Sequence, residues 1–152
     1  MTIAAEPFHD QPRRVDQLIA HYGQNHQNPS NELIHFIAIP LIMLSLIGML
    51  FALHPFVAYA FIAASMVYYA RLSAVFLLTM VVWSALTLAV VMAMGTNVLP
   101  ISVAIFVGAW ILQFIGHKLE GKKPSFFEDI QYLWVGPLFV LSKLFGRLGV
   151  KW

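Results

Sequence analysis

The feature that most constrains the fold is an apolar run from Leu33 to Leu53, in which His35 is the only ionisable side chain. At about 1.5 Å of rise per residue, a helix of roughly 20 residues crosses a hydrocarbon core of about 30 Å. Comparable runs follow it, and together they cover about 33–53, 56–70, 72–94 and 98–115. Hydrophobic residues make up 60% of the 152-residue chain and charged residues only 11%, which excludes an ordinary soluble domain. We therefore predict an all-α integral membrane protein with four transmembrane helices.

The segment before the first run is expected to lie at the membrane surface. Residues 1–11 are expected to form a disordered tail, and residues 12–152 a single membrane domain. After Pro12, apolar residues recur with the spacing of one helix face, at Val15, Leu18, Ile19 and Tyr22. This pattern predicts an amphipathic N-terminal helix that rests on the membrane.

A further helix is expected after the fourth run, at about 125–145. Ser125 and Glu128 have the Ser-x-x-Glu spacing of a capping box, which favours a helix start at this point. The uncharged run that follows, 130–142, is too short to cross a bilayer and contains Gly136-Pro137. We therefore predict an interfacial or re-entrant helix.

The distribution of positive charge predicts which side of the membrane the ends face. The loops at 54–55 and 95–97 contain no Lys or Arg, whereas the N-terminal flank, the turn at Arg71 and the 118–123 loop contain most of the nine. The positive-inside rule then places both termini in the cytoplasm. Because these charges flank apolar runs and form no basic stripe, no nucleic-acid partner is expected. The absence of cysteine excludes disulfides and thiolate metal ligands.

Three histidines stand out because this topology brings them to one face of the membrane. His35 lies near the cytoplasmic start of the first span, and His117 lies just past the cytoplasmic end of the fourth. An even number of crossings returns the chain to the same face, so these two can meet, and His26 can join them from the preceding loop. Neutral imidazole suits iron and zinc. We therefore predict a metal site at these three residues, although a histidine at a membrane edge also occurs simply as an interfacial polar group.

Other polar residues share helix faces with these histidines. Gln113, His117 and Glu120 fall at i, i+4 and i+7, and Asn31 and His35 fall at i and i+4. Amides and carboxylates typically orient metal-bound imidazoles through hydrogen bonds. Asn31 and Gln113 are therefore expected to orient the ligands, and Glu120 is a candidate fourth ligand. Gln113 is equally compatible with a hydrogen bond that joins two helices.

Two stretches of the chain resemble the Mpo-like 2-hydroxy-fatty-acid dioxygenase family, formerly a domain of unknown function. They are "HYGQNHQNPSNELIHFIAIPLI" and "WILQFIGHKLEGKKPSFFEDIQYLWVGPLFVL", at roughly 22–45 and 110–141, whereas the middle spans match only in hydropathy. The first family pattern falls on Tyr22, His26, Asn28, Pro29, Asn31 and His35. The second falls on Gln113, Phe114, Gly116, His117, Glu120 and Pro124.

The resemblance implies an iron(II)-dependent α-oxidation, in which a long-chain 2-hydroxy fatty acid and O2 give CO2 and a fatty acid one carbon shorter. It implies Fe(2+) held by His26, His35 and His117, with Tyr22 among the supporting residues. Three histidines leave three positions of an octahedral iron for the substrate carboxylate, its hydroxyl and O2. A site at headgroup depth suits such a substrate, because its polar end lies there while its acyl chain lies between the spans.

The remaining expectations concern partners and location. Positive side chains near the site could attract the substrate carboxylate, although they serve equally as topology charges; they are Lys118, Lys122 and Lys123. Membrane lipid is expected to surround the helices, and a homo-oligomer is compatible with the sequence. The resemblance favours a multi-pass protein of a bacterial inner membrane over one of the endoplasmic reticulum.

Alternative functions remain open on the same residues. A haem protein would use His35 and His117 as axial ligands, and a zinc-dependent lipid hydrolase would use Glu120 as its base. A proton-coupled transporter is disfavoured, because no ionisable group lies near the middle of the second and third spans. The dioxygenase ranks first, the haem protein second and the zinc hydrolase third.

Overall fold

The computed structural model describes residues 12–24, 26–121 and 133–152. These residues form helices and no strands, so the predicted all-α class is confirmed. The elements in chain order are α1 (Arg14–Gly23), α2 (Pro29–Leu53), α3 (Pro55–Ala70), α4 (Ala74–Ala93), the short 3-10 helix η1 (Gly95–Asn97), α5 (Val98–Glu120) and α7 (Val135–Leu148).

Within the described part of the chain, three segments are long and apolar enough to cross a membrane: Pro29–Leu53, Ala74–Ala93 and Gly95–Glu120. The second expected span, 56–70, corresponds to α3, which is apolar but has only 16 residues and is therefore about 24 Å long. The chain is thus consistent with a membrane protein. A fourth crossing, and with it the placement of both termini in the cytoplasm, stays a prediction.

The helix ends that carry the predicted histidines extend beyond the apolar runs. The helix α2 begins at Pro29, because the side chain of Asn28 accepts hydrogen bonds from the backbone N–H groups of Ser30 and Asn31. The helix α5 continues past the predicted end at residue 115 and stops at Gly121, whose φ of +75° is a left-handed conformation that glycine adopts without strain. His117 therefore lies on a regular helix and not in a loop.

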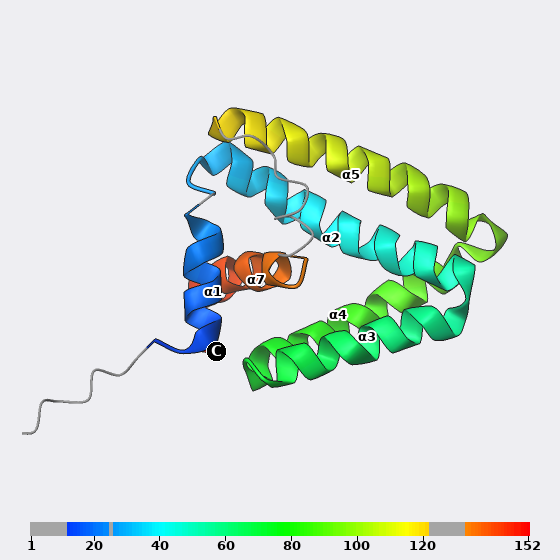
Figure 1. Ribbon diagram of the computed structural model, residues 1–152, viewed down its shortest axis with the longest axis horizontal. Coiled ribbons are helices and arrows are strands. Elements are labelled where there is room, and N and C mark those ends of the chain that lie inside the picture. The colour runs from blue at the N-terminus through cyan, green and yellow to red at the C-terminus, as the bar shows by residue number, and fades with distance from the viewer. Residues whose placement is uncertain (1–11, 25, 122–132) are drawn as a thin grey trace, which may run out of the picture.

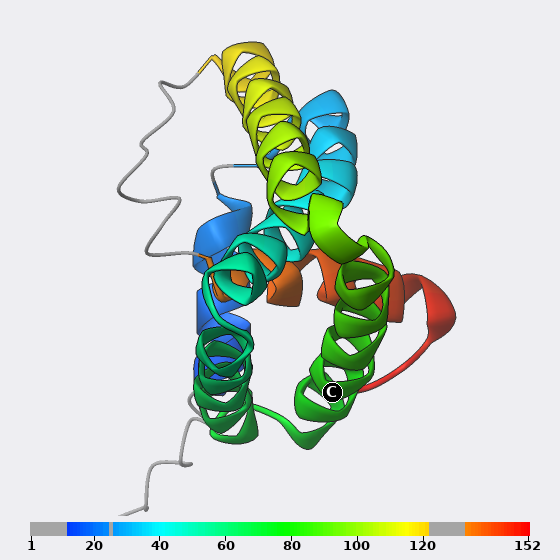
Figure 2. The same ribbon diagram turned by 90° about the vertical axis from the view of Figure 1, so that its right-hand side faces the viewer.

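The helices form two antiparallel pairs that diverge from one end of the molecule (Figure 1). One pair is α2 with α5, and the other is α3 with α4. The helix α7 lies between the two pairs, as both views show (Figure 1 and Figure 2). The helix α1 runs across the open end, where the two pairs are farthest apart (Figure 1). This open end contains the start of α2 and the end of α5, so it contains the predicted histidines.

The amphipathic N-terminal helix is present, and its apolar face packs against protein; its place at the membrane surface stays a prediction. Val15 is fully buried and lies in one cluster with Leu138 and Phe145 of α7. Tyr22 is also buried, in a second cluster with Phe139. The apolar face of α1 is therefore covered by α7.

The region of the predicted C-terminal helix is described only from residue 133 onward. Ser125 and Glu128 lie outside the described residues, and α7 begins at Val135. The Gly136-Pro137 pair occupies its first turn, where proline is tolerated because its missing N–H would have no partner within the helix. The pair therefore fits the start of α7.

Candidate metal centre

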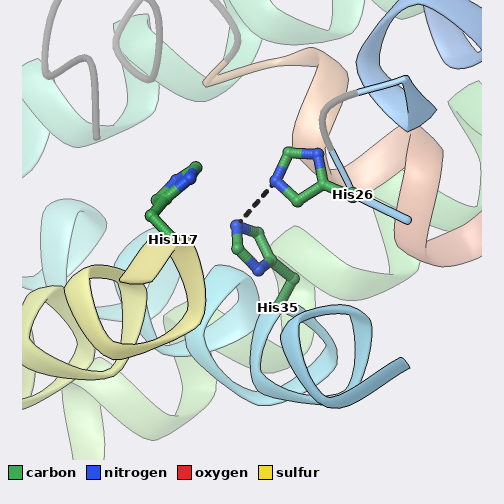
Figure 3. A group of neighbouring side chains, drawn as sticks. All are labelled: His26, His35 and His117. Atoms are coloured by element: carbon green, nitrogen blue, oxygen red, sulfur yellow. Dashed lines mark hydrogen bonds between the residues drawn. The ribbon is translucent and has the colours of Figure 1, made fainter. Parts of the chain in front are cut away.

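The structure brings His26, His35 and His117 together from three different segments (Figure 3). His26 lies between α1 and α2, His35 lies on the second turn of α2, and His117 lies on the last turn of α5. Each offers one ring nitrogen to a group in which all these nitrogens lie within 4.8 Å of one another. The three side chains are only 5%, 0% and 6% exposed, respectively. Burial of three imidazoles in contact is unusual without a common function.

Backbone carbonyl groups fix the tautomers of two of these rings. His26 Nδ1 lies 2.9 Å from the carbonyl oxygen of Tyr22, and His35 Nδ1 lies 2.9 Å from that of Asn31. A carbonyl oxygen only accepts hydrogen bonds, so each Nδ1 carries the hydrogen and donates it. In the neutral rings, each Nε2 then presents a lone pair.

These two lone pairs face each other. His26 Nε2 and His35 Nε2 are 2.9 Å apart, which is the contact drawn as a dashed line in Figure 3. When both rings are neutral and carry their hydrogens on Nδ1, no hydrogen lies between these two atoms. A proton on one ring would relieve the repulsion. A shared metal ion also relieves it, because two nitrogens bound at about 2.1 Å and at right angles are about 3 Å apart. The donor set therefore fits a metal, and His117 supplies a third nitrogen.

Aromatic side chains cover one side of the histidine cluster. The Tyr22 ring stacks on the His26 ring, with centroids 4.3 Å apart and an interplanar angle of 8°. The Phe139 ring of α7 lies 5.6 Å from the His26 centroid. Tyr22 thus supports His26 twice, with its ring and with its carbonyl oxygen. Phe139 was not identified in the sequence, although its place in the conspicuous apolar run at 130–142 was visible.

The predicted amides lie at the site, but they act differently from the expectation. Asn31 orients His35 through its backbone carbonyl, while its side-chain Nδ2 donates to Glu120 Oε2 at 2.9 Å. Gln113 lies one turn before His117 and is buried, and its Oε1 has no hydrogen-bond partner among the described residues. A buried acceptor beside the cluster is suited to a donor on a bound molecule.

Glu120 lies beside the cluster and is hydrogen-bonded to the segment that contains His26. Its Oε1 accepts from the backbone N–H of Gln27 at 2.9 Å, and its Oε2 accepts from that of Asn28 at 3.0 Å. The Asn28 side chain also donates to the carbonyl oxygen of Leu119 at 3.2 Å. Among the described residues, the group with metal-binding geometry contains the three histidines and not this carboxylate.

The basic residues proposed for the substrate carboxylate are only partly described. Lys118 is exposed at the end of α5, and Lys122 and Lys123 lie outside the described residues. Another lysine lies beside Phe139, one of the aromatic residues that cover the cluster. Lys143 of α7 forms a 3.0 Å ion pair with Glu32, and its Nζ lies 5.3 Å from the Phe139 ring centroid. No sequence pattern indicates this pair, because the two residues lie on helices that are far apart in the chain.

Comparison with known families agrees with this geometry. A family model described as "2-hydroxy-palmitic acid dioxygenase Mpo1-like" matches residues 13–148. The chain belongs to this family. The match includes all three histidines and the middle helices, for which the sequence analysis had found only a likeness in hydropathy. No curated protein and no solved structure matches the chain. The name of the Mpo1-like family implies dioxygenase chemistry on a 2-hydroxy fatty acid.

Proposed function

We propose that this Mpo1-like chain is an iron(II)-dependent dioxygenase that shortens 2-hydroxy fatty acids by one carbon. The observation that carries the proposal is the pair of Nε2 lone pairs of His26 and His35, 2.9 Å apart and beside His117. The family name supplies the substrate class. The substrate R-CH(OH)-COOH and O2 give R-COOH, CO2 and H2O, so that the C1–C2 bond breaks and O2 takes up four electrons.

The roles of the chain's own residues follow from their hydrogen bonds. The carbonyl groups of Tyr22 and Asn31 hold the His26 and His35 rings in the tautomer that presents Nε2 to a metal. Tyr22 and Phe139 shield the His26 ring from water. Bound iron would supply the one-electron chemistry that O2 requires to react with a closed-shell acid. The residues thus keep the ligands oriented and shielded from water.

A haem at His35 and His117 is disfavoured by the same geometry. The centroids of these two rings are 5.4 Å apart, and the His26 ring lies 4.2 Å from His35 and 5.6 Å from His117. A porphyrin between two axial imidazoles would have to occupy the space that His26 fills. The histidine arrangement therefore favours a single ion over a haem.

An apolar cavity near the cluster is suited to the hydrocarbon chain of the substrate. It has a volume of about 290 Å³, lies between α2, α4 and α7, and has an apolar lining. Ile39 lines it, one helical turn after His35, and also packs with Tyr22 and Phe139, which contact the His26 ring. Ile39 is therefore part of the wall between the histidines and the cavity.

The cavity continues along α4 for the length of a fatty-acyl chain. A second apolar space of about 180 Å³ shares Pro40, Trp83 and Leu86 with the first. Together they follow α4 from Thr79 to Val90, which is about 16 Å of helix. An extended alkyl chain advances about 1.3 Å per carbon, so roughly a dozen methylene groups fit along this length.

Filling this space is expected to shorten the preferred substrate. Leu86 lines both parts of the cavity and is 59% exposed, so Leu86→Trp narrows the space without disturbing the core. We expect kcat/KM for long chains to fall about tenfold and that for short chains to change little. The matched control is Val81→Trp, on the same helix, 46% exposed and outside the cavity. Identical chain-length profiles for the two variants would show that the chain binds elsewhere.

The position of the hydroxyl group tests the proposed reaction. Purified protein, loaded anaerobically with Fe(II), is exposed to O2 with a 2-hydroxy, a 3-hydroxy or an unsubstituted acid of the same length. We expect a product one carbon shorter, with an equal amount of CO2, from the 2-hydroxy acid alone. Only that isomer has oxygens on both carbons of the bond that breaks. Equal turnover of the 3-hydroxy acid, or no shortened product from any acid, would refute the proposal.

A further inference from the structure

We infer that Glu120 is a positioning residue that joins the three ligand-bearing segments, and not a metal ligand. The inference rests on the proposed metal site. Glu120 lies three residues after His117, on the last turn of α5. Its carboxylate binds the backbone immediately after His26, at Gln27 and Asn28, and the side chain of Asn31. One carboxylate thus contacts the neighbours of all three histidines.

Hydrogen bonds from neighbouring segments matter more for the position of His26 than for the positions of His35 and His117. His35 and His117 are held by the backbone of long helices, whereas His26 lies between α1 and α2, outside any helix. Within the N-terminal part of the chain, its ring bonds the Tyr22 carbonyl and its backbone N–H donates to the Gly23 carbonyl oxygen. The bonds from the Gln27 and Asn28 backbone to Glu120, together with the bond from the Asn28 side chain to the Leu119 carbonyl oxygen, connect this segment to the helix carrying His117.

The chemistry of these bonds explains why a carboxylate is needed. Both backbone N–H groups precede the first turn of α2, where donors have no partner within the helix and the helix dipole favours negative charge. Hydrogen bonds to an ionised acceptor are roughly twice as strong as those between neutral groups. Glu120 Oε1 accepts one bond and Oε2 accepts two, so both oxygens are already engaged. Among the described residues, the group with metal-binding geometry consists of the three histidines and does not include this carboxylate.

Cobalt(II) binding to the full-length apoprotein tests the inference, with visible d–d absorption as the readout. For Glu120→Ala we expect the dissociation constant for Co(II) to rise by about 10–100-fold, because the three ligands remain but His26 is no longer held. At saturating Co(II) the absorption bands should match those of the wild type. A changed spectrum at saturation would show that Glu120 is a ligand, and an unchanged dissociation constant would show that it has no role.

Two further variants make the test specific. Glu120→Gln keeps one acceptor oxygen and is expected to weaken Co(II) binding less than Glu120→Ala does. If the alanine variant does not fold, the glutamine variant tests whether Glu120 is a ligand or a positioning residue. Glu32→Ala is the matched control, since the Glu32 carboxylate pairs with Lys143 of α7 and not with the backbone of Gln27 and Asn28. Its Co(II) affinity should stay within about twofold of the wild type. A loss equal to that of Glu120→Ala would overturn the inference, because it would reflect general destabilisation.

This readout separates the inference from the proposed reaction. If wild-type protein binds Co(II) and the Glu120 variants bind it weakly with the same spectrum, the positioning role holds even when the iron-loaded protein turns over no 2-hydroxy acid. If all Glu120 variants bind Co(II) like the wild type, the positioning role is wrong even when turnover is observed.

Discussion

Replacement of His35 by alanine is expected to abolish high-affinity metal binding while the protein still inserts and folds. Loss of hydrogen bonds around a ligand typically costs 10–100-fold in metal affinity, so loss of a ligand should cost more than about 100-fold. His35 is the most buried of the three histidines and lies nearest His26 in ring-centroid distance, at 4.2 Å. We expect the same result for His26→Ala and His117→Ala. Titration of each purified variant with Co(II) measures the effect.

His21→Ala is the control for this series. His21 is an exposed histidine on α1, and it lies outside the metal-binding group. Its replacement should leave the Co(II) dissociation constant within about twofold of the wild-type value. Wild-type affinity in the His35→Ala variant would show that the buried histidines are an interfacial polar cluster and not a metal site.

Replacement of Gly116 by alanine is expected to disrupt the site by preventing the close packing of α2 against α5. A Cβ at Gly116 would overlap Asn31 Oδ1 and would lie 3.4 Å from Ile34 Cγ2. The Asn31 side chain cannot turn away without losing its bond to Glu120, so α2 and α5 must move apart next to His117. We expect a loss of about 1–3 kcal/mol in the free energy of unfolding and weaker Co(II) binding. Thermal unfolding in detergent and metal titration measure the two effects.

Gly108→Ala provides a matched control on the same helix. A Cβ at Gly108 has no neighbour within 4 Å. This substitution should be neutral or should stabilise α5 by up to about 1 kcal/mol, because alanine is the better helix former. Equal stability and equal Co(II) affinity for the two glycine variants would show that the close approach at Gly116 is not required.

The helices could be predicted because they follow from the lengths of the apolar runs. The proximity of His35 and His117 could be predicted because it follows from the directions in which the helices run. Asn28-Pro29 marks the start of α2 through ordinary capping chemistry, and the structure has the helix start there. His35 and His117 meet because α2 and α5 are antiparallel and each places its histidine at the same end. Only His26, which lies in no helix, needed the further assumption that a loop folds back.

The details of the site could not be predicted, because they depend on contacts between distant segments. The backbone carbonyl of Asn31, and not its amide, accepts from His35, and nothing in an i, i+4 spacing distinguishes the two. The burial of the apolar face of α1 against α7 was missed, since an amphipathic pattern is the same whether the face meets lipid or protein. The bonds of Glu120 to backbone N–H groups have no sequence pattern at all.

Metal-dependent single turnover tests the central claim most directly. One preparation of wild-type apoprotein is divided and loaded anaerobically with Fe(II), with Zn(II) or with no metal, and each sample is mixed with a long-chain 2-hydroxy acid and then with O2. We predict that the iron-loaded sample forms the acid one carbon shorter, in proportion to the iron that it binds, and that the other two samples form none. Equal product in all three samples, or no product from protein that has bound iron, would contradict the account.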